Sequence, residues 1–192
     1  MPRDRLAAFS DGVIAILITI MVLGLRIPRG VTLEALRPVL PQFLSYIVSF
    51  VFLGIYWSNH HHLLHVVERV NGRILWANLH LLFWLSMIPF ATGWVGENHV
   101  ASGPTALYGV VLLLEAIAYF ILVRSIIKAQ GPDSRLARIL GRDLKSKVSV
   151  GLYAAAIPLA FLAPWIADAI YVAVALIWLV PDKRIESGFY GK

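Results

Sequence analysis

The sequence contains no cysteine and few charged residues. Asp, Glu, Lys and Arg together make up only 15% of its 192 residues. The lack of cysteine excludes disulfide bonds, thiolate metal sites and a cysteine nucleophile. A soluble domain has about 25% charged and about 45–50% apolar residues, whereas 59% of this chain is hydrophobic and its mean hydropathy is +0.75. The composition therefore excludes a water-soluble enzyme or a nucleic-acid-binding module, and it predicts an all-α integral membrane protein.

Long runs without charge define the expected membrane helices, because about 20 apolar residues are needed to cross a bilayer as a helix. We predict a single domain over residues 1–192 with six transmembrane helices, at about 6–27, 42–67, 73–95, 104–128, 146–163 and 166–181. The last run is the shortest. The first helix carries Asp11 and lacks a small-residue cleavage site, so we expect it to remain in the membrane and not to be removed as a signal peptide.

The basic residues are distributed unevenly between the two sides of such a bundle. If both termini are cytoplasmic, 14 of the 17 Lys and Arg residues fall on the cytoplasmic side, and only Arg26, Arg29 and Arg37 fall outside. Cytoplasmic loops of membrane proteins are enriched in Lys and Arg. The charge pattern therefore favours six spans with cytoplasmic N- and C-termini. It also predicts that the basic segment 129–145 contacts the anionic lipids of the inner leaflet.

Polar side chains of three expected helices reach the same depth. Ser10 and Asp11 lie in the cytoplasmic third of the first helix, the run from Asn59 to His62 ends the second, and Asn78 begins the third. A carboxylate at that depth needs a hydrogen-bond donor, which an imidazole or an amide can supply. We predict a structural latch that fixes the first helix to the next two. A proton relay is the alternative interpretation.

The histidines also allow a metal-binding interpretation. His61 and His65 are four residues apart and share a helix face, as two zinc ligands do. A third ligand would have to come from elsewhere, for example Asp11 or Glu68. Interfacial histidines more often form only hydrogen bonds, so we expect neither a metal site nor a cofactor.

One apolar face of the first helix stands out. Ile16, Ile20 and Leu23 follow the i, i+4, i+7 spacing, and Thr19 lies beside them. Such a stripe alone is typical of ordinary helix packing.

The start of the first helix resembles a known family. The segment Arg5-Leu6-Ala7-Ala8-Phe9-Ser10-Asp11 has the R-x-x-x-F-S-D pattern of the endolysosomal potassium channels called transmembrane protein 175, and of their bacterial homologues in particular. The length, the six spans, Asn59-His60-His61 and Trp76-Ala77-Asn78 also resemble the bacterial members, so the resemblance covers the whole chain. It implies an inter-helix network that consists of Arg5, Phe9, Ser10, Asp11, Asn59, His60, His61 and Asn78.

The resemblance also implies a function. Family members of this length form homotetramers in which four copies of the first helix line one pore, so we expect a potassium-permeable cation channel in the bacterial plasma membrane. Besides potassium ions and the other three copies of the chain, the expected partners of the channel are membrane lipids. The chain has no T-V-G-Y-G filter segment. Instead, a hydrophobic gate and modest selectivity are expected from Ile16, which lies five residues after Asp11, with Thr19 as a polar layer and Ile20 and Leu23 as further rings.

Some features have no counterpart in the family pattern. The roles of the His60–His62 run and of Glu115 stay open. A small secondary transporter, possibly proton-coupled through Glu115 and Asp11, is the alternative function, although the sequence shows neither an internal repeat nor a discontinuous helix pair. A membrane enzyme or metal protein centred on the histidines is a third, less favoured class.

Overall fold

The chain folds into a bundle of helices. The computed structural model describes residues 2–67, 70–98, 101–131, 134, 136–137 and 144–179, and all regular structure in these residues is helical. Helices suit a chain of this composition because they satisfy their own backbone hydrogen bonds inside a membrane. The elements are α1 (Arg3–Leu23), the short 3-10 helix η1 (Leu33–Val39), α2 (Leu40–His65), α3 (Gly72–Leu85), α4 (Ile88–Glu97), α5 (Ser102–Gln130), α7 (Leu144–Leu162) and α8 (Pro164–Leu179).

Five segments are long and apolar enough to cross a membrane. They are α1, η1 with α2, α3 with α4, α5, and Lys145–Leu162 of α7. The sixth expected span corresponds to α8, which is apolar but has only 16 residues. The observed bounds of α2, α5 and α7 lie within about two residues of those predicted. The basic residues Arg135, Arg138 and Arg142 and the C-terminal tail lie outside the described residues, as does Glu68.

The third expected helix is interrupted. We predicted one helix over 73–95, but α3 ends at Leu85 and α4 begins at Ile88. Pro89 lies in the first turn of α4. Proline has no backbone N–H to donate and its φ angle suits that position, so it begins a new helix more readily than it continues an old one.

The first helix ends four residues before its predicted bound, and Gln42 organises the segment that follows. The Gln42 side chain donates a hydrogen bond from Nε2 to the Gly24 carbonyl (2.8 Å) and accepts one from the Arg26 backbone N–H (3.0 Å). Arg26 also forms an ion pair with Glu97 at the end of α4 (3.0 Å). These contacts join the ends of α1, α2 and α4 opposite the N-terminus.

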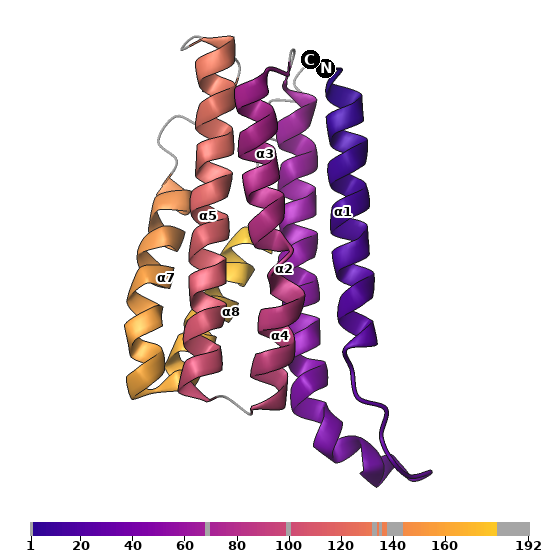
Figure 1. Ribbon diagram of the computed structural model, residues 1–192. Coiled ribbons are helices and arrows are strands. Elements are labelled where there is room, and N and C mark those ends of the chain that lie inside the picture. Colours follow the sequence, from indigo (N-terminus) through magenta and orange to yellow (C-terminus); the bar gives the residue numbers. More distant parts are fainter. Residues whose placement is uncertain are drawn as a thin grey trace.

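The position of α1 in the bundle leaves one of its sides uncovered. Figure 1 shows α1 at one edge of the bundle, with α5 and α7 at the opposite edge. Helix α1 packs against α2, α3 and α4, whereas α5 packs against α3, α4, α7 and α8. The core includes the fully buried side chains of Leu53, Leu81, Leu85 and Leu112. The outer side of α1 therefore has no partner within the described part of the chain.

Candidate pore face and inter-helix network

Helix α1 has one buried and one exposed face. Its buried residues are Leu6, Ser10, Ile14, Leu17 and Met21. They are spaced three or four residues apart, so they form a single stripe directed toward α2, α3 and α4. The large apolar residues on the other side remain uncovered.

The apolar residues singled out in the sequence lie on this exposed face. The exposed fractions are 56% for Ile16, 47% for Ile20 and 81% for Leu23, compared with 7% for Leu17. Phe9, seven residues before Ile16, is also half exposed. Packing within the described part of the chain therefore does not account for the stripe. The exposed face requires lipid, or another copy of the chain, to cover it.

Thr19 lies on the same face and bonds only to its own helix. Its hydroxyl donates to the backbone carbonyls of Ile16 (2.9 Å) and Ala15 (3.1 Å). The side chain is exposed. Thr19 is thus a polar position among apolar ones, and it lies in the helical turn between Ile16 and Ile20.

Three polar side chains from three helices meet in the buried interior. Asn78 of α3 donates from Nδ2 to the Ser10 hydroxyl of α1 (3.0 Å), and the Asn78 oxygen lies 2.6 Å from Nε2 of His60 in α2. Ser10 donates in turn to the Leu6 carbonyl (2.9 Å). All three side chains are fully buried. The network connects α1, α2 and α3 at one point.

The hydrogen bonds determine the tautomer of His60. The Asn78 oxygen can only accept, so Nε2 of His60 carries the hydrogen. The other ring nitrogen, Nδ1, is buried and has no partner among the described residues. His60 is therefore held in place by a single bond to Asn78.

Other residues expected in the network are directed elsewhere. Asn59 donates to the Ile55 carbonyl of its own helix (2.8 Å), and Nε2 of His61 lies 3.0 Å from Nε2 of His65. Arg5 and Phe9 are exposed, and Arg5 makes no hydrogen bond to any described residue. Of the eight expected members, the structure thus brings together Ser10, His60 and Asn78.

Asp11 has a partner that the sequence analysis missed. Its Oδ1 accepts a hydrogen bond from Nε1 of Trp57 (3.0 Å), not from the expected imidazole or amide. The Trp57 ring also lies 5.8 Å from the His61 ring. An indole N–H satisfies a carboxylate as well as an amide does. The available clue was that Trp57 lies one turn before His61 on the same side of the helix.

Trp57→Phe tests the strength of this contact. The substitution keeps an aromatic ring but removes the donor, and Asp11 is only half-buried, so we expect a loss of stability on the order of 1 kcal/mol. Thermal unfolding of the purified protein measures it. Trp76→Phe is the control, because Trp76 is 75% exposed and makes no hydrogen bond to the described residues. Equal shifts in the two variants would show that the Asp11 contact contributes nothing.

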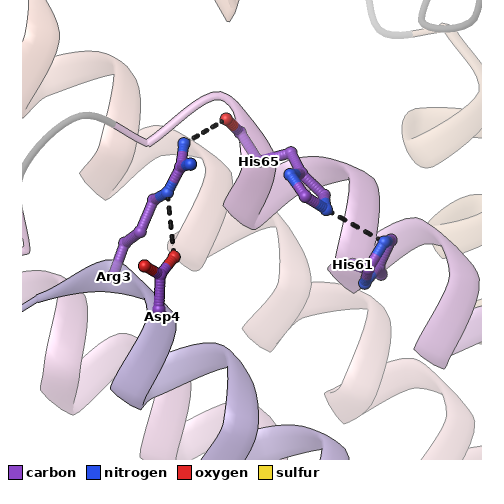
Figure 2. A network of polar contacts seen from close by, with 4 residues as sticks. All are labelled: Arg3, Asp4, His61 and His65. Carbon is purple, nitrogen blue, oxygen red and sulfur yellow. Dashed lines mark hydrogen bonds and ion pairs between the residues drawn. The ribbon is translucent and has the colours of Figure 1, made fainter.

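The pair of half-buried His61 and exposed His65 lies close to the start of α1. Figure 2 shows Arg3 of α1 donating to the His65 carbonyl (2.9 Å) and pairing with Asp4 (3.2 Å), while His65 and His61 are in contact with each other. Among the described residues, no three His, Asp or Glu side chains gather in a way that could hold a metal. Asp11, one of the two possible third ligands, is bonded to Trp57. Glu68, the other possible third ligand, lies outside the described residues, so the expectation of no metal site stays a prediction.

Comparison with known proteins identifies relatives of the whole chain. The family described as endosomal/lysosomal potassium channel TMEM175 matches residues 5–89. A protein of Chryseobacterium named a potassium channel is 54% identical over 186 residues, which is 97% of each chain. A Streptomyces collinus protein, also named a potassium channel, is 35% identical over 60% of each chain.

A solved structure has the same fold. The crystal structure of a TMEM175 homologue from Chamaesiphon minutus, described as a lysosomal potassium-selective channel homologue, matches with a TM-score of 0.76 and 27% identity. The match covers 92% of this chain and 95% of that one. Close sequence similarity over nearly the full length, together with this structural match, leads to one conclusion: the chain belongs to the TMEM175 family of potassium channels.

Proposed function

We propose that four copies of this chain form a potassium-permeable cation channel, with the exposed face of α1 lining a central pore. The observation that carries the proposal is the exposure of Ile16, Ile20 and Leu23 while the opposite face of α1 packs on its own bundle. A row of large apolar side chains on an edge helix can be covered when symmetric copies of the chain assemble around a common axis. The potassium channels among its relatives support the same assignment.

The narrowest point of the proposed pore is a ring of four Ile16 side chains. An apolar ring narrow enough to exclude water forms a hydrophobic gate that opens by wetting. An ion that passes it must lose part of its hydration shell. Potassium holds water less tightly than sodium does, so the barrier is lower for potassium. This mechanism gives a modest preference and needs no backbone carbonyl filter.

Thr19 adds a polar layer just beyond this ring. The hydroxyl oxygen lies on the same exposed face, within one turn of Ile16. Four such oxygens can replace part of the water that a potassium ion loses at the ring. The next apolar rings, Ile20 and Leu23, would then continue the pore toward the other side of the membrane.

The network of Ser10, His60 and Asn78 would hold the pore helix in position. The exposed face of α1 can form a pore of fixed width only if the opposite face is anchored. Buried polar contacts are directional, so they set the rotation of α1 more strictly than apolar packing does. We infer that the network is structural.

We infer that the channel lies in the bacterial plasma membrane with both termini in the cytoplasm. The carrying observation is the charge distribution, with 14 of 17 basic residues on the proposed cytoplasmic side. Fusion of a reporter that is active only in the cytoplasm to either terminus tests this orientation.

Recordings from planar bilayers with potassium on one side and sodium on the other test the channel itself. We expect single-channel current steps and a reversal potential that favours potassium. A secondary transporter would give no steps, and its flux would saturate with substrate. The same recordings with a chelator should be unchanged, since the mechanism uses no metal cofactor.

Thr19→Val should lower the preference for potassium over sodium while conductance persists. Valine has nearly the shape of threonine but lacks the oxygen that would solvate a partly dehydrated ion. The permeability ratio from the reversal potential is the measurement, and a severalfold decrease is expected. Val22→Thr is the control, because it exchanges the same two side chains in the opposite direction at another exposed position of α1. An unchanged ratio in Thr19→Val would assign selectivity to the apolar rings.

A further inference from the structure

A groove opens between α2 and α8 at the end of the bundle opposite the N-terminus. It measures about 240 Å³, and most of its lining is apolar, from Pro41, Leu44 and Val48 of α2, Val95 of α4 and Val172 of α8. Leu44 is 60% exposed and Val172 is 38% exposed, so the groove reaches the outer surface of the bundle. A single water needs only about 10–15 Å³, so the groove has room for a larger group. None of the lining residues belongs to α1.

One carboxyl group lies in this apolar groove. Asp168 of α8 contributes to the lining and is half-buried. It makes neither a hydrogen bond nor an ion pair with any residue that the structure describes. A carboxylate that is partly withdrawn from water is costly unless a donor or a cation reaches it. Because no described residue supplies that partner, a ligand that carries positive charge is favoured in the groove.

The hydroxyl groups of the lining are already bonded. Ser45 and Tyr171 donate to backbone carbonyls, over 3.0 Å and 3.3 Å respectively. The Tyr108 hydroxyl is paired with that of Ser49 (2.8 Å). The oxygens of Ser45 and Tyr171 therefore have only lone pairs left to offer. Together with Asp168 they favour a ligand that has N–H donors as well as positive charge, and a primary ammonium has three such donors.

The groove lies near the surface of the membrane. Trp165 lies three residues before Asp168 on α8 and is 68% exposed, and Trp94 lies next to Val95 on α4 and is 40% exposed. Tryptophan side chains are enriched at the level of the lipid headgroups. In the proposed orientation this end of the bundle faces the outside. The headgroups of the outer leaflet and the first part of their acyl chains are therefore level with the groove.

We propose that the groove binds a phospholipid of the outer leaflet whose headgroup carries a primary ammonium. The ammonium pairs with the Asp168 carboxylate, and one acyl chain lies against the apolar residues of α2 and α8. A phospholipid supplies both the cation and a chain that makes van der Waals contacts with the lining. A quaternary ammonium headgroup has the same charge but no N–H donor, so it binds less tightly. Only the choice of leaflet rests on the proposed orientation of the channel, and the site itself does not depend on the pore.

A series of lipids that differ only in headgroup methylation tests the proposal without any substitution in the protein. Native mass spectrometry of the purified protein in detergent measures binding of phosphatidylethanolamine, its N-methyl and N,N-dimethyl derivatives, and phosphatidylcholine, all with the same acyl chains. We expect the affinity to fall with each methyl group, and at least tenfold from the first lipid to the last. Equal affinity across the series would overturn the proposal, because the lipids would then contact the protein only through groups that they share.

Substitutions of Asp168 connect this preference to the groove. Asp168→Asn removes the charge and keeps the size of the side chain, so the affinity for phosphatidylethanolamine should fall to within twofold of that for phosphatidylcholine. Asp168→Glu keeps the charge and should retain a measurable preference. Glu34→Gln is the matched control, because Glu34 is an exposed acid of η1 that does not line the groove. It should leave the preference unchanged.

Two results with these variants would contradict the proposal. An unchanged preference in Asp168→Asn would place the ammonium at another site. A smaller oligomer of Asp168→Asn in lipid-free detergent would identify a basic side chain of a second copy as the partner of Asp168. Val172→Phe narrows the apolar part of the groove and should weaken binding of both lipids alike. Thermal unfolding without lipid verifies that each variant is folded, and the methylation series decides the matter if Asp168→Asn is not.

Discussion

Ile16→Asn should increase the channel's conductance and reduce its discrimination between potassium and sodium. In the proposed tetramer, four amides would replace four butyl groups at one level, so water would fill the constriction and ions would no longer need to lose their shells. We expect a severalfold rise in single-channel conductance and a permeability ratio near one. Ile16→Ala should act in the same direction but more weakly, because it widens the ring without adding polarity.

The neighbouring residue provides the control for this prediction. Leu17 points about 100° away on the helix and is only 7% exposed. Leu17→Asn should bury an unpaired amide, so it should reduce the yield of folded protein and lower the total current. If Ile16→Asn behaved as Leu17→Asn does, or folded well with unchanged current and selectivity, α1 would not line the pore as proposed.

Asn78→Ala should be the most destabilising change in the polar network. It removes the side chain that bonds both Ser10 and His60, and it leaves two fully buried polar groups without that partner. We expect a loss of about 1–3 kcal/mol. Because Ser10 belongs to α1, the variant should also weaken the attachment of the pore helix. Thermal unfolding and the fraction of tetramer in detergent are the measurements.

Asn59 is a matched control for this change. It is also an asparagine of the same region, but its side chain bonds only to a carbonyl of its own helix. Asn59→Ala should therefore cost much less than Asn78→Ala. A double-mutant cycle compares Ser10→Ala, Asn78→Ala and the variant that carries both substitutions. It should show a coupling energy if the hydrogen bond between Asn78 and Ser10 stabilises the fold. Equal effects of the two asparagine variants would remove the structural role of the network.

The lengths of the uncharged runs predicted most of the helices but not the residues at which they end. The runs before Arg69 and around Glu115 were long enough to give α2 and α5 almost directly. The early end of α1 depends on Gln42, a side chain sixteen or more residues away, and no local pattern contains that contact. Similarly, Pro89 fits either a kinked helix or a new one. In the structure, the Met87 N–H donates to the Trp84 carbonyl (3.0 Å), three residues back, so the α-helical hydrogen-bond pattern is interrupted before Ile88.

For the candidate site, the sequence predicts the depth of each polar residue in the membrane, but it does not predict the rotation of each helix about its own axis. The spans bring Asp11, Asn59 and Asn78 to one level, and the sequence is sufficient for that inference. Which asparagine enters the interior depends on how each helix is turned about its axis, which packing determines. A donor for Asp11 was expected, but its identity as Trp57 required the relative rotation of α1 and α2. Likewise, only the packed bundle shows that Glu115 is fully buried and that neither of its carboxyl oxygens has a hydrogen-bond partner among the described residues.

The direction of the Thr19 O–H bond affects whether the proposed pore passes cations or anions. That hydrogen is directed to the carbonyls of Ala15 and Ile16, so the side that faces away from the helix offers only oxygen lone pairs. Four copies around an axis would form a ring of acceptors with no donor, which attracts a bare cation and repels chloride. Charge discrimination would then require no acidic residue at the constriction, because the backbone of α1 fixes the direction of each hydroxyl dipole.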